Sequence, residues 1–214
     1  MQIKINNLTK KIHGTTVLNN ISLEFNSNKI YGLSGKNGSG KTMLMRAISG
    51  LIRPTDGEII IGDGILGKDF SFPPSIGVLI ENPSFIPKYT GFKNLKLLAS
   101  IQNKTSDSEI KQTLNDVGLD PEDKRPYRKY SLGMKQRLGI ACAIMEKPQI
   151  ILLDEPINAL DESGITLIKE LLLKLSDNSI IIISCHDREE LEYLSDEVFV
   201  MSEGRIIEHR IVGL

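Results

Sequence analysis

The sequence predicts an α/β fold in which a mainly parallel sheet is covered by helices on both faces. Two short, continuous apolar runs, at residues 150–153 and 180–183, alternate with segments of helical periodicity. Strands of a parallel sheet are buried on both faces and therefore show unbroken Ile, Val and Leu runs. The chain has 214 residues, of which 40% are hydrophobic, so it is long enough for one domain with a sizeable core.

Apolar spacing places the elements along the chain. Residues 2–5 and 17–25 alternate apolar and polar side chains, whereas 30–34 and 76–80 are continuous apolar runs. Residues 62–74 are rich in Gly and Pro and are expected to form a loop. The remaining strands are expected at residues 58–61, 150–153, 180–184, 197–201 and 205–208, and helices at 43–49, 132–145, 165–175 and 188–194.

A change of apolar spacing predicts a helical insert. Gly118 follows the last periodic residue and is expected at the C-terminal end of a helix. From Asn94 onward, apolar residues recur at helical spacing, at Leu95, Leu98, Ile101, Ile110, Leu114 and Val117. We therefore expect a single domain over residues 1–214, with a helical subdomain at 90–133 between two parts of a core, 1–89 and 134–214.

Composition excludes several classes of protein. The 26 basic and 27 acidic residues leave a net charge of −1, and the chain has no Trp, so neither a dedicated nucleic-acid binder nor an aromatic stacking platform is expected. Cys142 and Cys185 are far apart and do not form a zinc or disulfide pattern, which predicts two buried thiols in a reducing compartment. No apolar run approaches the roughly 18–20 residues of a membrane span. A protein of the cytoplasm is expected.

The strongest motif lies between a predicted strand and a predicted helix. Glycines let backbone N–H groups curl around phosphates, and the following helix N-terminus adds partial positive charge. The motif's Lys is expected to reach the β- and γ-phosphates, and its Thr hydroxyl to hold Mg²⁺. The sequence Gly35-Lys36-Asn37-Gly38-Ser39-Gly40-Lys41-Thr42 fits the pattern G-x-x-x-x-G-K-[ST].

Two other strand ends carry polar residues suited to phosphate chemistry. Asp154 and Glu155 follow the apolar run 150–153; Asp154 is expected to bind the metal or its water, and Glu155 to polarise an attacking water. His186 follows the run 180–184 and is expected to contact the γ-phosphate or orient the water. Strand-end loops on one edge of a parallel sheet meet at one crevice, so these residues and the phosphate loop are expected to converge.

A capped helix start gives a second candidate anion site. Ser131 is a natural N-cap for the helix predicted at 132–145. This segment and the motifs above occur in the family's order along essentially the whole chain, and together they resemble the nucleotide-binding subunit of an ABC transporter. Ser131–Met134 resembles the signature segment of that family, and residues 158–161 resemble its D-loop.

The resemblance implies a P-loop NTPase core of the ABC ATPase type, an N-terminal antiparallel β subdomain and an inserted helical subdomain. It implies an ATPase in which two subunits enclose two ATP molecules, with Mg²⁺ as cofactor. Each ATP would contact the phosphate loop of one copy and Ser131 and Gly133 of the other. Glu155 and His186 would be the catalytic residues, and Thr42 and Asp154 would hold the metal.

The sequence departs from the family at three places. Ser131 and Gly133 are kept, but the usual Leu-Ser-Gly-Gly-Gln is Tyr-Ser-Leu-Gly-Met here. The aromatic residue that stacks on adenine falls near Ile12 or His13. The family's Q-loop glutamine falls on Glu81, whose repulsion from a triphosphate 4 Å away would be roughly 4 kcal/mol at an effective dielectric of 20. Glu81 is therefore expected either to bind Mg²⁺, which we favour, or to turn away until a partner docks.

Partners also follow from the resemblance. The string from Ser131 onward, with Glu81 at the Q-loop, resembles the bacitracin-resistance and lantibiotic-immunity exporters. This implies a transmembrane permease subunit, a second copy of the chain or a paralogous ATPase, and a place on the inner face of the membrane. Residues 85–89 are expected either to bind the permease or to pack the helical insert. A soluble ABC ATPase, such as the iron–sulfur assembly type, and a regulatory ATP-binding module remain open.

Overall fold

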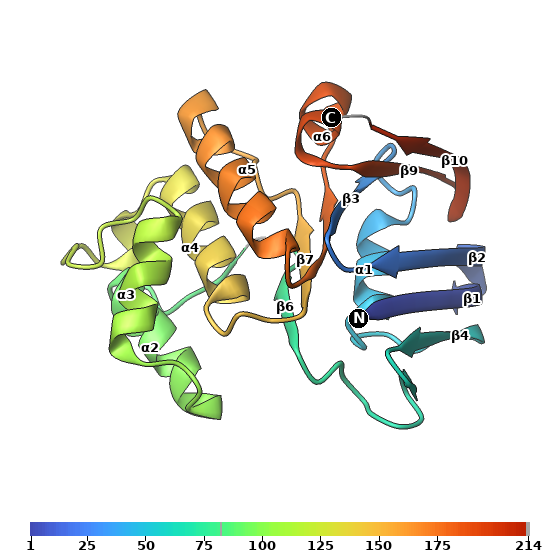
Figure 1. The fold of residues 1–214 in the computed structure, drawn as a ribbon, viewed down its shortest axis with the longest axis horizontal. Helices are drawn as coiled ribbons and strands as arrows, with labels where there is room; N and C mark the ends of the chain where they lie inside the picture. The colour runs from blue at the N-terminus through green and yellow to red at the C-terminus, as the bar shows by residue number, and fades with distance from the viewer. Residues whose placement is uncertain (82, 213–214) are drawn as a thin grey trace.

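The computed structural model describes residues 1–81 and 83–212 and contains two sheets with helices packed around them (Figure 1). A four-stranded antiparallel sheet has the order β2-β1-β4-β5, and a six-stranded sheet has the order β10-β9-β3-β8-β7-β6. Five strands of the second sheet are parallel, and only β10 pairs antiparallel, with β9. The strands are β1 Gln2–Ile12, β2 Thr15–Asn26, β3 Lys29–Ser34, β4 Asp56–Ile61, β5 Gly64–Ile65, β6 Ile76–Leu79, β7 Ile150–Asp154, β8 Ile180–Ser184, β9 Glu197–Ser202 and β10 Arg205–Ile211.

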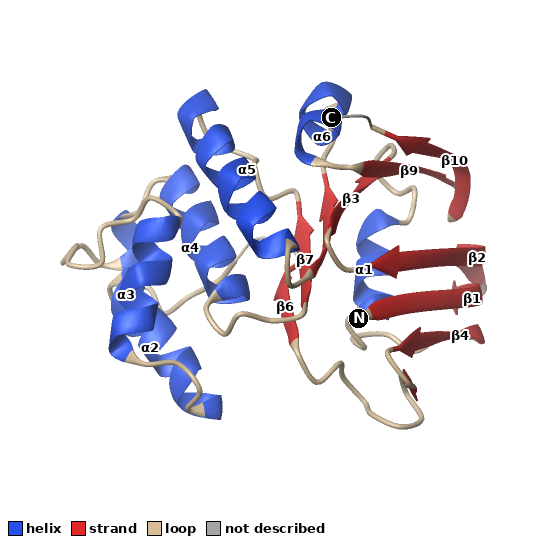
Figure 2. Ribbon diagram, in the orientation of Figure 1, coloured by secondary structure: helices blue, strands red, loops and turns tan. Residues whose placement is uncertain are grey.

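The helices lie at one end of the molecule and around the parallel strands in its middle. Figure 2 shows α2, α3 and α4 gathered at the end opposite the antiparallel sheet, with the parallel strands between them. Helix α1 lies between the two sheets, whereas α5 and α6 cover the other face of the parallel strands. The helices are α1 Lys41–Ile48, α2 Gly91–Gln102, α3 Asp107–Asp116, α4 Leu132–Ile144, α5 Glu162–Ser176 and α6 Arg188–Leu194, with one 3₁₀ turn at Tyr127–Lys129.

The parallel strands separate two hydrophobic cores. Ile151 and Ile181 face the core shared with α2 to α6, and their neighbours Leu152 and Ile182 face the core shared with α1 and the antiparallel sheet. All four side chains are fully buried. Burial on both faces explains why these strands are continuous apolar runs and confirms the predicted mainly parallel sheet.

The predicted elements are found, and the largest differences are in three regions. Strand β1 extends to Ile12, beyond the predicted end at Ile5, and bulges after Ile5 shift its register on β2 and break the apolar alternation that would have indicated the longer strand. The region predicted as a loop at 62–74 contains the short strand β5. The helical insert contains two helices, α2 and α3, and Gly118 follows α3 with φ 74°, as a helix-ending glycine does.

Both cysteines are free thiols inside the fold. Burial raises the pKa of the Cys142 thiol and of the Cys185 thiol to about 11. Both side chains therefore stay as protonated thiols at neutral pH, as expected for core residues rather than nucleophiles.

Candidate nucleotide site

The phosphate loop joins strand β3 to helix α1, as the motif requires. Gly35 has φ 144°, and a Cβ added there would lie 2.4 Å from the main-chain oxygen of Met201, so only glycine fits. Gly40, with φ 111°, sits directly before the first turn of α1. The loop is thus held in a curve whose N–H groups and helix N-terminus suit an anion.

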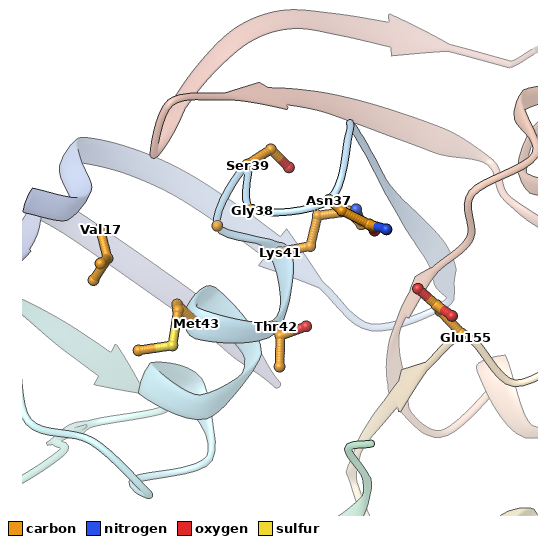
Figure 3. A pocket seen from close by; sticks show the side chains of 9 residues that line it. Val17, Asn37, Gly38, Ser39, Lys41, Thr42, Met43 and Glu155 are labelled. Carbon is orange, nitrogen blue, oxygen red and sulfur yellow. The ribbon is translucent and has the colours of Figure 1, made fainter. Parts of the chain in front are cut away.

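Lys41 lies inside this curve. Its side chain is 6% exposed, and its Nζ donates a hydrogen bond of 2.6 Å to the main-chain oxygen of Gly35. Burial lowers the pKa of Lys41, whereas the carboxylates of Glu155 and Asp154 raise it. A cation held among backbone groups, facing an open pocket of about 250 Å³, is suited to a polyphosphate (Figure 3).

Asp154 forms the second part of the site at the end of β7. Its Oδ2 accepts a 2.7 Å hydrogen bond from the Thr42 hydroxyl, and its Oδ1 accepts one from the Ser184 hydroxyl. The carboxylate is almost fully buried. A hydroxyl and a carboxylate in direct contact are hard oxygen donors of the kind that Mg²⁺ prefers, so these residues fit a magnesium ion.

Glu155 projects into the same pocket from the residue after Asp154. Its φ of 54° is unusual for a non-glycine residue, and its N–H donates to the main-chain oxygen and the hydroxyl of Ser184 at 3.1 and 3.0 Å. Its carboxylate is in contact with His186 Nε2 and accepts a hydrogen bond from Asn158 Nδ2. Figure 3 shows Glu155 across the pocket from Asn37 and Thr42, so its carboxylate faces the space in which the phosphate loop would bind an anion.

The structure brings together most, but not all, of the predicted site residues. Ser131 and Gly133 line a separate pocket of about 580 Å³ beside Ala159 and Asp161. The Ser131 hydroxyl is exposed and accepts from Met134 N at 3.2 Å, which makes it the expected N-cap of α4. The predicted residues that line the phosphate-loop pocket are Asn37, Gly38, Ser39, Gly40, Lys41, Thr42 and Glu155. The main-chain oxygens of Gly35 and Lys36 accept hydrogen bonds from Lys41, and His186 contacts the Glu155 carboxylate.

Glu81 does not lie with the metal-binding candidates Thr42 and Asp154 in this structure. Its carboxylate forms an ion pair with the guanidinium of Arg46 on α1, and its side chain is 64% exposed. The sequence does not reveal this counter-charge, because Arg46 and Glu81 are 35 residues apart. The uncompensated cost of roughly 4 kcal/mol therefore does not apply, while metal binding by Glu81 stays a proposal.

Three polar contacts and the apolar lining of the pocket are not among the predictions from the sequence. The Ser184 hydroxyl was detectable, because a polar residue ends a buried strand whose pairing places it opposite Asp154. Gln136 holds Glu155 from α4, an element that the sequence alone does not bring to the end of β7, whereas Asn158 holds it from three residues along the same loop. In place of an aromatic residue, the pocket has Val17 and Met43 as apolar lining, among the residues the structure describes.

Comparison with protein families agrees with the resemblance that the sequence motifs indicate. The family model described as ABC transporter matches residues 18–158. The chain belongs to the ABC transporter family. It is one of the family's ATPase subunits, and the predicted P-loop NTPase fold with an antiparallel sheet and inserted helices is confirmed.

Sequence relatives in this family are similar over nearly the whole of this chain. The chain is 50% identical over 205 residues to an uncharacterized ABC transporter ATP-binding protein, YybJ, of Bacillus subtilis, covering 95% of this chain and 94% of that one. It is 43% identical to the bacitracin transport ATP-binding protein BcrA of Enterococcus faecalis, covering 96% and 68%. It is 38% identical to the lantibiotic transport ATP-binding protein SrtF of Streptococcus pyogenes, covering 96% and 89%. The expected resemblance to this group is confirmed.

A solved structure has the same fold. The dimeric structure of a bacterial ABC transporter cassette superimposes with a TM-score of 0.87 at 25% identity, covering 99% of each chain. Within residues 1–81 and 83–212, no helix of this ABC transporter ATPase is both long enough and apolar enough to cross a bilayer.

The Arg46–Glu81 pair gives a first prediction. Arg46→Gln removes the counter-charge of the Glu81 carboxylate, which is then free to repel the triphosphate, so the Kd for ATP is expected to rise about two- to fivefold, the range of an exposed pair. The double variant Arg46→Gln, Glu81→Gln should return to the wild-type Kd. Titration with a fluorescent ATP analogue measures both, with Arg53→Gln as a control for loss of one charge. Equal affinity of Arg46→Gln and wild type would contradict the prediction.

Proposed function

We propose that this chain is the ATP-binding and ATP-hydrolysing subunit that powers an ABC exporter of peptide antibiotics of the bacitracin or lantibiotic class. The observation that carries the ATPase assignment is the Glu155 carboxylate facing the phosphate loop, directly after the Thr42–Asp154 pair. The export assignment is supported by the relatives named for bacitracin and lantibiotic transport.

In this proposal the phosphate loop and Lys41 bind the β- and γ-phosphates. Thr42 and Asp154 hold Mg²⁺, which supplies charge neutralisation at the phosphates when bound. Glu155 accepts a proton from the attacking water, and His186 holds the Glu155 carboxylate toward the pocket. Catalysis is then mostly positioning and electrostatic stabilisation, as is usual for phosphoryl transfer.

We further propose that the active unit is a dimer. Ser131 and Gly133 lie at a pocket separate from the phosphate loop of their own chain, so a second copy or a paralogous ATPase is needed to bring such a signature segment to the ATP. The dimeric solved cassette supports this arrangement. ATP binding would close the dimer, and hydrolysis would reopen it.

The chain is also proposed to act on the inner face of the membrane, bound to a transmembrane permease. Of the residues expected at that contact, Phe85 is partly buried, with its ring edge-on to Tyr127 at 5.3 Å, so it packs the helical region. Tyr89 is 41% exposed and Ile86 is 39% exposed, so these two side chains remain available for the permease.

Co-purification tests the exporter assignment. Tagged chain is expressed in its native cell, and detergent-solubilised membranes are purified with measurement of Mg-ATP hydrolysis. A polytopic membrane protein is expected in stoichiometric amount, and a soluble partner in its place would favour a non-transport ABC ATPase. ATP binding without turnover would favour a regulatory module.

Tyr89→Glu is expected to reduce recovery of the membrane protein at least about fivefold, since it puts a charge into an apolar contact. ATP hydrolysis by the isolated subunit should stay within about twofold of wild type. Tyr193→Glu is the matched control, because Tyr193 is a similarly exposed tyrosine (49%) on α6. Full recovery with Tyr89→Glu would place the permease contact elsewhere.

A further inference from the structure

The first two turns of α4 lie against the loop that follows Asp154. Gln136 is 9% exposed, and its Nε2 donates a 2.8 Å hydrogen bond to the main-chain oxygen of Glu155. A Cβ added to Gly133 would lie 2.8 Å from the main-chain oxygen of Ala159, so this turn packs closely on the middle of the loop. The helix that begins at Ser131 is therefore in direct contact with the segment that carries the catalytic carboxylate.

The next residue of α4 reaches the end of the same loop. Arg137 Nη2 lies 3.5 Å from Asp161 Oδ1, and Nη1 donates to the main-chain oxygens of Val117 and Gly118 at 3.3 and 3.4 Å. Asp161 is the N-cap of α5. Side chains and backbone of α4 thus contact loop 155–161 at its start, middle and end.

Glu155 needs such support, because its backbone conformation is unfavourable for a residue with a side chain. Its N–H is held by Ser184 of β8. Its carbonyl oxygen accepts from Gln136 at 2.8 Å and from Asn158 N at 3.3 Å. The Gln136 bond is the shorter of the two and the one that comes from outside the loop, so it ties the backbone of Glu155 to α4.

We propose that Gln136 is a positioning residue that couples the two nucleotide sites of the dimer. In the shared-site arrangement, which this inference takes from the proposed function, one chain offers Ser131 to one ATP and Glu155 to the other. Nucleotide contact at Ser131 fixes the N-terminus of α4. Gln136 lies five residues further along the same helix, and its hydrogen bond to the Glu155 carbonyl then fixes the backbone of Glu155. Nucleotide bound at one site thereby fixes the position of the Glu155 carboxylate at the other site, which makes hydrolysis at the two sites cooperative.

Gln136→Met tests the coupling, because Met is close to Gln in size but cannot donate to the carbonyl. We expect kcat to fall about tenfold, KM for ATP to stay within about twofold, and the Hill coefficient to drop to about 1. Gln112→Met is the matched control, because Gln112 is exposed on α3 and bonds only Asp116 among its described contacts. Wild-type kcat and Hill coefficient in Gln136→Met would overturn the proposal.

Gln136→Glu supplies a second readout that a purely structural role would not move. An ionised Glu cannot donate to the carbonyl, but a protonated one can, and burial raises the pKa of a carboxyl at such a site. The ratio of variant to wild-type kcat is therefore expected to rise as the pH falls from about 8 to 6. His186, Lys41 and the carboxylates around Glu155 are the same in both proteins, so the ratio removes the pH dependence that the two proteins share. A flat ratio would overturn the proposal, even if Gln136→Met fails to fold.

Hydrogen exchange separates failure of this inference from failure of the proposed function. A wild-type chain that does not hydrolyse ATP would refute the proposed function, yet peptides covering residues 155–161 would still report the tether. Faster exchange of those amides in Gln136→Met than in Gln112→Met supports the tether, whatever the activity. Unchanged exchange refutes it.

Discussion

Glu155→Gln is expected to lower kcat for ATP hydrolysis by at least about 10²-fold while leaving the Kd for ATP within about twofold of wild type. General-base catalysis contributes about 10²- to 10⁴-fold, and an amide in place of the carboxylate cannot accept the proton of the attacking water. The substitution keeps the size of the side chain. The hydrogen bonds that hold the backbone, from Gln136 and Ser184, should persist.

The same variant is expected to accumulate as a dimer in Mg-ATP, because closure is no longer followed by hydrolysis. Phosphate release and size-exclusion chromatography with Mg-ATP measure the two effects on one preparation. Glu162→Gln is the control, since Glu162 is exposed in the first turn of α5. Hydrolysis at a near wild-type rate would move the base to another residue, of which His186, already on the Glu155 carboxylate, is the next candidate.

The site residues that the sequence predicts are those whose reactive groups stand next to a local signal of secondary structure. The phosphate loop and the pair Asp154 and Glu155 each follow a buried strand, and the parallel sheet then places their strand ends at one edge. The start of α3 also has a local signal, because Ser106 and Glu109 form a capping box there.

The rest of the site depends on contacts between distant elements. Arg46 meets Glu81 only when α1 packs beside the loop after β6, and Gln136 meets Glu155 only when α4 packs beside β7. Neither contact has a local periodicity or a motif to predict it. The extension of β1 was hidden for another reason, since bulges after Ile5 shift successive side chains between faces and remove the alternation that identifies a strand.

The second large effect concerns which chain completes each site. Lys41→Ala removes the cation inside the phosphate loop, and Ser131→Arg fills the start of α4 with a long side chain; each homodimer is expected to lose at least about 10²-fold in hydrolysis. If sites are shared across the dimer, a heterodimer of these two chains has one site with both lesions and one with neither. Activity is expected to return to well above that of either homodimer and to at most about half of wild type per dimer, because only one of the two sites is intact and the coupling through Gln136 lowers its rate further.

The matched control places the same two lesions in one chain. A heterodimer of wild type with the double variant Lys41→Ala, Ser131→Arg then has one lesion in each shared site, so its activity is expected to stay near that of the single variants. Two different affinity tags purify each heterodimer, and phosphate release is measured on verified dimers. If each chain instead completed its own site, the two results would be exchanged, because the unaltered chain of the control would keep an intact site. The pair of heterodimers therefore decides whether Ser131 acts on the ATP held by Lys41 of the same chain or of the other chain.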